Sequence, residues 1–192
     1  PQTDTYRNGQ SLIVGIGTGF NVCPVKVELG RRPSCLAAEL GHAGLPLSLI
    51  ALLEERFPGE ARSFRTVEDC FSGNGLSTIF SLLGGSPALS GAEIVAQHIA
   101  GNDPAATGTL ELFAALLGGL CKEMALQYLP LNGIYFAGSV ARGLFQSGLS
   151  PVFLNAFANH RQFQEQLSNT PVALILDDAA ALLGCVNACK SR

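Results

Sequence analysis

Residues 11–28 read SLIVGIGTGFNVCPVKVE, and the fold is best approached from this stretch. Two apolar runs rich in β-branched residues flank the turn Gly17-Thr18-Gly19. Branched side chains favour extended strands, and glycine permits a tight reversal of the backbone between them. The stretch therefore predicts a β-hairpin at the start of the fold.

Helical patterns and apolar runs alternate through the rest of the chain. We expect strands over residues 64–71, 132–141 and 171–178, and helices over 48–57, 72–85, 91–99, 105–129, within 142–167 and over 179–190. Residues 1–10 resemble a polar lead-in or linker, and residues 29–46 a glycine- and proline-rich loop. The uninterrupted apolar strands predict a mixed central sheet with helices on both faces. This order of elements is that of the actin-like ATPase half-domain, a ribonuclease H-like α/β fold.

Composition narrows the classes of function. Of the 192 residues, 47% are hydrophobic and 14% are charged, which indicates thorough burial and a further apolar surface. The net charge of −3 and the lack of a basic block give no support for nucleic-acid binding. The longest apolar run, near 110–129, is interrupted by Glu111, Lys122 and Glu123, so no membrane span is expected. Six cysteines without a C-x-x-C pair suggest reduced, structural thiols and a cytoplasmic protein.

Two glycine-rich stretches are candidates for nucleotide contacts. In GIGTGFN, residues 15–21, glycines allow backbone N–H groups to approach phosphate oxygens, and Thr18 offers a hydroxyl. In YFAGSVAR, residues 135–142, a buried strand ends at Gly138 before a helix, which is where α/β folds place nucleotides. Each has a simpler alternative: an unliganded hairpin turn in the first case, and close packing of helix on strand in the second.

Two further stretches carry candidate ligands for a polyol. Glu39 and His42 lie three residues apart in AAELGHAGLPL, residues 37–47, and Glu68 precedes the Ser-Gly-x-Gly turn of VEDCFSGNGL, residues 67–76. A carboxylate accepts several hydroxyl hydrogen bonds, and a neutral imidazole both donates and accepts, so this set suits a sugar. The alternatives are an exposed loop and a solvated strand end. A metal site or a serine hydrolase is not indicated, because no H-x-x-x-H spacing and no G-x-S-x-G motif occurs.

Taken in order, these stretches resemble the bacterial glucokinase family, and specifically its larger C-terminal domain. The resemblance runs from GIGTGF to the closing AALLG, and EDCFSGNGL is its most specific part. ELGH is similar to the family's Glu-Gly-Gly-His motif, and IYFAGSVARG resembles its adenosine-side motif. The related ROK kinases also use a Glu-x-Gly-His motif, but their cysteine-rich zinc segment does not occur in this sequence.

The resemblance implies a two-domain, actin-like sugar kinase that uses ATP and Mg²⁺ to convert glucose into glucose 6-phosphate. It implies that the glucose ligands are Glu39, His42 and Glu68. It also assigns Gly17, Thr18 and Gly19 to the phosphate turn and Gly138 to the adenosine side. It implies no residue of this chain as a metal ligand. Three positions depart from the family pattern, because Asn21, Leu40 and Ser139 stand where glycine is usual. Asn21 is expected to narrow the space for a phosphate.

The family's general base, an aspartate of the smaller N-terminal domain, finds no counterpart in residues 1–192. We therefore expect residues 11–192 to be the C-terminal domain of a longer enzyme, with no catalytic residue of its own and negligible kinase activity alone. The surface that the N-terminal domain would cover favours self-association as a homodimer. A non-catalytic, sugar-binding regulator of the same fold and a ROK-type hexose kinase are the alternatives.

Overall fold

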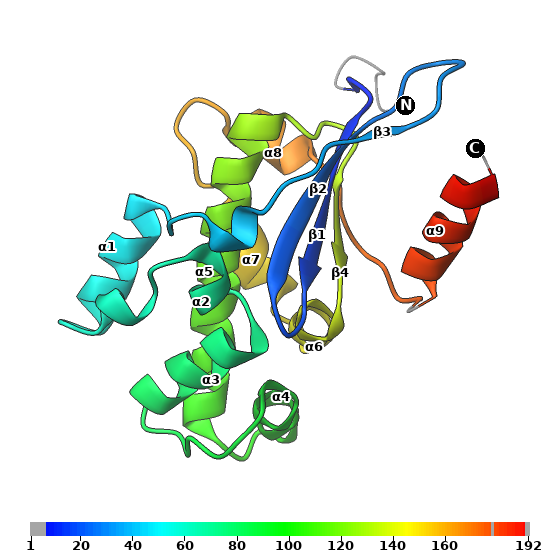
Figure 1. Ribbon diagram of the computed structural model, residues 1–192. Helices are drawn as coiled ribbons and strands as arrows, with labels where there is room; N and C mark the ends of the chain where they lie inside the picture. Colours follow the sequence, from blue (N-terminus) through cyan, green and yellow to red (C-terminus); the bar gives the residue numbers. More distant parts are fainter. Residues whose placement is uncertain (1–6, 178, 191–192) are drawn as a thin grey trace.

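The hairpin predicted from residues 11–28 lies in the middle of a sheet (Figure 1). In the computed structural model, which describes residues 7–177 and 179–190, β1 (Gln10–Ile16) pairs antiparallel with β2 (Phe20–Lys26). Alternate residues of β1, including Leu12 and Val14, are fully buried, because side chains of a strand point to opposite faces in turn. The hairpin is confirmed, and β1 begins at Gln10, the last residue of the predicted lead-in.

The sheet is mixed, as predicted, with strand order β3-β2-β1-β4-β5. β4 (Ile134–Ala137) runs parallel to β1, and β5 (Val172–Leu174) runs parallel to β4. Both strands are shorter than the predicted 132–141 and 171–178. Gly133 and Gly138 bound β4 with φ of 127° and 97°, values that end an extended strand. β3 (Ser34–Cys35) lies in the stretch predicted to be a loop, and pairs antiparallel with β2.

The predicted helices are present with small changes at their ends. They are α1 (Leu47–Arg56), α3 (Gly73–Leu82), α4 (Gly91–Ala100), α5 (Pro104–Tyr128), α6 (Ser139–Gln146), α7 (Ser150–Ala158), α8 (Gln164–Asn169) and α9 (Ala180–Lys190). Short 3₁₀ turns, η2 (Leu40–His42) and η3 (Ala61–Ser63), interrupt the loops. The start of α5 follows from its sequence, because the Asp103 side chain caps it and Pro104 occupies the first turn.

The strand predicted over residues 64–71 is wrong, because the helix α2 (Val67–Cys70) occupies this place. The Thr66 hydroxyl accepts the backbone N–H of Asp69, and the Asp69 carboxylate accepts the N–H of Thr66 at 2.8 Å. This reciprocal capping box starts a helix immediately before Val67. Only Thr66 keeps strand-like pairing, through an isolated bridge to Gly44.

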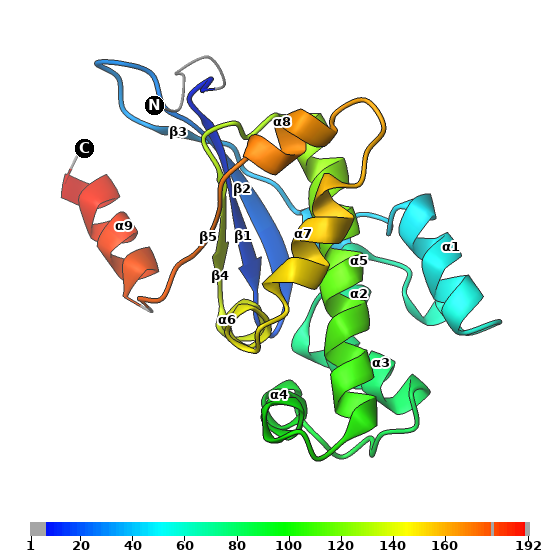
Figure 2. The ribbon, with the colours of Figure 1, turned by 180° about the vertical axis from the view of Figure 1, so that it is seen from behind.

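The long helix α5 forms the centre of the core on one face of the sheet (Figures 1 and 2). It packs against α7, α3 and α4, and its buried residues include Phe113, Leu117 and Met124. Among the described residues, α5 has the length and apolar composition that a membrane span needs, but most of that apolar stretch is buried inside the protein. It is therefore a core helix.

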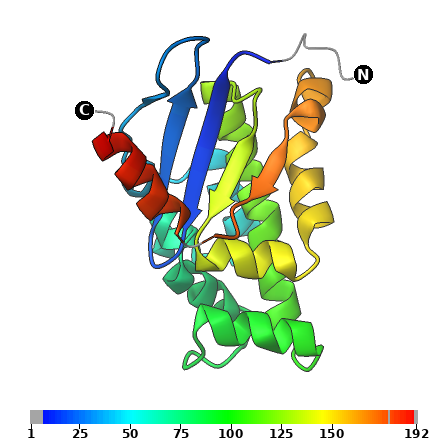
Figure 3. The same ribbon diagram turned by 90° about the vertical axis from the view of Figure 1, so that its right-hand side faces the viewer.

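Within residues 7–177 and 179–190, α9 is the one helix that lies on the opposite side of the sheet (Figure 3). Helices thus lie on both sides, as predicted. However, Leu182, Leu183 and Val186 of α9 remain 70%, 56% and 47% exposed. The second face of the sheet is therefore covered much less than the first, and α9 presents an apolar surface of its own.

Cys23 is half-buried, and the other five cysteines divide into two groups. Cys70 and Cys121 are fully buried, and burial raises the pKa of both thiols far above the usual range. These two fill space in the core, as predicted for structural cysteines. In contrast, Cys35, Cys185 and Cys189 are exposed, so a role in packing is wrong for them.

Candidate functional site

The predicted phosphate turn is fixed at both of its ends. The N–H of Gly17 donates to the carbonyl of Gly19 at 2.9 Å, which closes the turn between β1 and β2. The N–H of Gly73, the first residue of α3, donates to the carbonyl of Gly17 at 2.9 Å. A Cβ added to Gly17 would lie 4.0 Å from the hydroxyl of Ser139, at the start of α6. The structure thus brings the two nucleotide-like stretches together, and leaves Thr18 exposed between them.

Glu68 reaches this turn from α2. Its Oε2 accepts the backbone N–H of Phe20 at 2.9 Å, just after the phosphate turn. The approach needs two residues without side chains, since a Cβ on Gly19 would lie 2.4 Å from Oε2 and one on Gly41 would lie 2.1 Å from the Phe20 carbonyl oxygen. The carboxylate is half-buried, so it is held by the hairpin while it remains accessible to a ligand.

An aromatic cluster supports the backbone at Phe20. The ring of Phe20 packs on Phe71, with ring centroids 6.0 Å apart, and Phe71 packs edge-on against Phe113 of α5 at 5.6 Å. Phe71 directly follows α2, which carries Glu68. The core therefore fixes both partners of the hydrogen bond between Phe20 and Glu68.

Glu39 immediately precedes the 3₁₀ turn η2, and His42 is the last residue of that turn. The N–H of His42 donates to the Glu39 carbonyl at 3.2 Å, and both side chains are exposed. η2 packs against α2 and β2, which brings Glu39 and His42 near Glu68, beside the predicted phosphate turn. Asn21, the residue after Phe20, donates from Nδ2 to Oε2 of Glu39 at 3.3 Å.

Asp69, the neighbour of Glu68, has a structural role in capping α2. Burial alone would raise the pKa of the Asp69 carboxyl, but hydrogen bonds from Thr66 and Arg65 outweigh it, so the pKa is lowered. The carboxylate is occupied by the cap of α2. Of the two adjacent acidic residues, only Glu68 therefore remains as a candidate ligand.

Gly138 is required by packing. It caps the N-terminus of α6 with φ of 97°, and a Cβ there would lie 2.2 Å from the carbonyl oxygen of Ile16. Close contact between α6 and β1 thus accounts for this glycine without a ligand. Its assignment to the adenosine side stays a prediction.

A pocket of about 290 Å³ adjoins Ser139. Its walls come from three helices, with Leu76 from α3, Gly91 and Val95 from α4, and Gly143 from α6. Sequence reasoning missed the contribution of α4. The contact that brings α4 to α6 joins residues far apart in the chain, since a Cβ on Gly143 would lie 3.0 Å from Val95.

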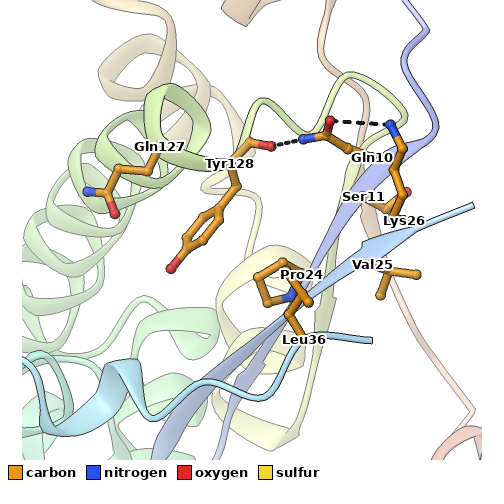
Figure 4. Close-up of a pocket in the computed structure, with 8 residues that line it drawn as sticks. All are labelled: Gln10, Ser11, Pro24, Val25, Lys26, Leu36, Gln127 and Tyr128. Carbon is orange, nitrogen blue, oxygen red and sulfur yellow. Dashed lines mark hydrogen bonds between the residues drawn. The ribbon is translucent and has the colours of Figure 1, made fainter. Parts of the chain in front are cut away.

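A second pocket, of about 320 Å³, lies at the opposite end of the sheet (Figure 4). There the side-chain amide of Gln10 donates to the carbonyl of Tyr128, and Lys26 donates to Gln10 at 3.5 Å. None of the predicted site residues lines this pocket. The predicted site residues therefore lie away from this pocket, toward the end of the sheet where β1 turns into β2.

Comparison with solved structures defines the class of protein. A glucokinase from an Antarctic psychrotroph superposes with a TM-score of 0.78 at 22% identity, over 100% of this chain and 61% of that one. A glucokinase from Balamuthia mandrillaris in complex with glucose gives a TM-score of 0.68 at 17% identity, over 85% of this chain and 49% of that one. The chain thus has the fold of the actin-like sugar kinases.

Sequence comparison narrows the class further. The family model described as Glucokinase matches residues 2–192, and the chain belongs to the glucokinase family. A glucokinase of Nitrobacter hamburgensis is 30% identical over 97% of this chain. The chain spans only 59% of the length of that relative. The family resemblance predicted from the four motifs is confirmed.

Proposed function

We propose that residues 11–192 are the larger, C-terminal domain of a cytoplasmic glucokinase. The reaction would be the first step of glycolysis, in which ATP and glucose give ADP and glucose 6-phosphate. The observation that carries the proposal is the junction at Phe20 and Asn21. At this junction, two adjacent residues of β2 hold Glu68 and Glu39 directly beside the Gly17–Gly19 turn.

In this proposal Glu39, His42 and Glu68 bind sugar hydroxyls. The carboxylates accept hydrogen bonds, and the imidazole donates from one nitrogen or accepts at the other. Their role is to orient glucose, because phosphoryl transfer depends chiefly on positioning and on stabilisation of charge. The proton of the attacking hydroxyl would go to an aspartate of an N-terminal domain, as the family resemblance implies.

The residues of the turn and of α6 suit a nucleotide. Thr18 is exposed between two glycines, so its hydroxyl and the nearby backbone can approach phosphate oxygens. The pocket beside Ser139 offers room for the nucleoside. ATP supplies the phosphoryl group, and Mg²⁺ neutralises part of its charge. In the described part of the chain no three acidic, histidine or cysteine residues form a metal cluster, so the phosphates and water would hold most of the Mg²⁺ shell.

The exposure of Glu39 and His42 supports a site completed by a second domain. Closure of that domain would exclude water and bring the base to the sugar. We therefore expect negligible phosphorylation by the 192-residue chain alone. The apolar side chains exposed on α9 are compatible with further association, including a homodimer.

A non-catalytic sugar-binding regulator remains the second candidate, favoured by Asn21 and Ser139 at positions where the family usually has glycine. Separate titrations with glucose and with ATP distinguish the two, using the protein encoded by the complete reading frame. The kinase proposal expects both ligands to bind. Binding of glucose without ATP would favour the regulator, and binding of neither ligand would overturn both.

A further inference from the structure

The side chain of Asn21 is hydrogen-bonded to the loop that carries Glu39 and His42. Its Nδ2 donates to the carbonyl of Ala38 at 2.8 Å and to Oε2 of Glu39 at 3.3 Å. Its Oδ1 accepts the N–H of Leu40 at 3.2 Å and that of Val22 at 2.8 Å. Both amide hydrogens and the carbonyl oxygen are thus in use, which is the full capacity of an asparagine side chain.

These bonds attach three consecutive residues of the loop to the sheet, of which Glu39 is exposed and Ala38 and Leu40 are half-buried. The loop leaves β3 at Leu36, whose N–H donates to the Pro24 carbonyl at 2.9 Å. Between Leu36 and Gly41, three hydrogen bonds join the loop to the sheet in the described part of the chain. All three are made by the Asn21 side chain. Without them only the packing of Ala38 and Leu40 against the core would hold the segment, and segments with few hydrogen bonds open more easily.

The geometry bears directly on Glu39. An exposed glutamate samples several rotamers, and fixing it costs conformational entropy when a ligand binds. The bond from Asn21 to Oε2 offsets part of that cost in advance and leaves Oε1 for a sugar hydroxyl. The neighbouring residue, Phe20, fixes Glu68 in the same way through its backbone N–H.

We propose that Asn21 is a positioning residue that holds the Glu39 carboxylate and its loop in the orientation that binds the sugar. This inference rests on the proposed sugar kinase function. It gives Asn21 a role in the sugar half of the site, although sequence alone places it next to the phosphate turn.

Two substitutions test the proposal in the protein of the complete reading frame. Asn21→Ala removes all four bonds, and should raise the KM for glucose roughly tenfold while the KM for ATP stays within about twofold. Asn21→Asp keeps an acceptor for Leu40 but places a negative oxygen against the Glu39 carboxylate, and should raise the glucose KM at least as much. Asn155→Ala, at an exposed position on α7, is the matched control and should change neither KM.

Amide exchange and a double-variant cycle separate positioning from a general loss of structure. The amide of Leu40 should exchange faster in Asn21→Ala and stay protected in Asn21→Asp, while core amides of α5 stay protected in both. Asn21→Ala should add little to the effect of Glu39→Gln if it acts through Glu39. Full additivity, or an unchanged glucose KM with unchanged exchange at Leu40, would overturn the inference. Failure of the wild-type protein to bind glucose would instead overturn the proposed function.

Discussion

Replacing Glu68 by glutamine changes one atom and the charge at the centre of the site. Glutamine keeps an oxygen for the 2.9 Å hydrogen bond from the Phe20 N–H, so the hairpin should stay in place. It loses the charge and one acceptor oxygen, and it turns a donor toward the sugar hydroxyl. An unmatched partner in a charged hydrogen bond costs about 1–3 kcal/mol. Since about 1.4 kcal/mol corresponds to a factor of ten, the KM for glucose should rise about 5- to 150-fold.

The assay is steady-state glucose phosphorylation by the protein of the complete reading frame, with glucose and ATP varied separately. Asp69→Asn is the matched control. It also removes one negative charge, but from the neighbouring residue, whose carboxylate caps α2. It should leave the glucose KM near the wild-type value. If Glu68→Gln leaves both KM and kcat unchanged, Glu68 does not bind the sugar and the reasoning fails.

Three further predictions concern stability and reactivity. Gly138→Ala should lower the free energy of unfolding by about 2 kcal/mol or more in chemical denaturation, because φ is 97° and a Cβ would strike the backbone of β1. Asp69→Ala should cost about 0.5–2 kcal/mol at neutral pH. Because folding lowers the pKa of Asp69, its contribution is complete above about pH 4 and is lost as the pH falls further, so the variant should lose less stability in acid. Iodoacetamide should label Cys35 in the folded chain and reach Cys70 and Cys121 only on unfolding, as mass spectrometry would show.

Local sequence signals predicted the elements that depend on local chemistry. Alternating β-branched residues around Gly17 and Gly19 identified the hairpin, because strand preference and turn geometry are both encoded there. The error at residues 64–71 was avoidable, since Thr66 and Asp69 have the spacing of a capping box. By contrast, the two residues of β3 have no strand signal of their own, and form a strand because β2 lies beside them.

The sequence allowed the candidate residues to be chosen, but it did not show how the fold arranges them. Glu39, His42 and Glu68 were selected by chemistry and by family resemblance, and the fold does bring them near one another. The role of Asn21 was not accessible, because its partners lie 17 to 19 residues away and are fixed by tertiary packing. The wall that α4 contributes to the pocket beside Ser139 was missed for the same reason.

The most direct test of the central claim is transfer of phosphate from ATP to glucose by the protein of the complete reading frame. The account predicts glucose 6-phosphate as the product, with a glucose KM that rises in the Glu68→Gln variant and an ATP KM that does not. Glucose binding without any product, or turnover that is indifferent to Glu68, would contradict it.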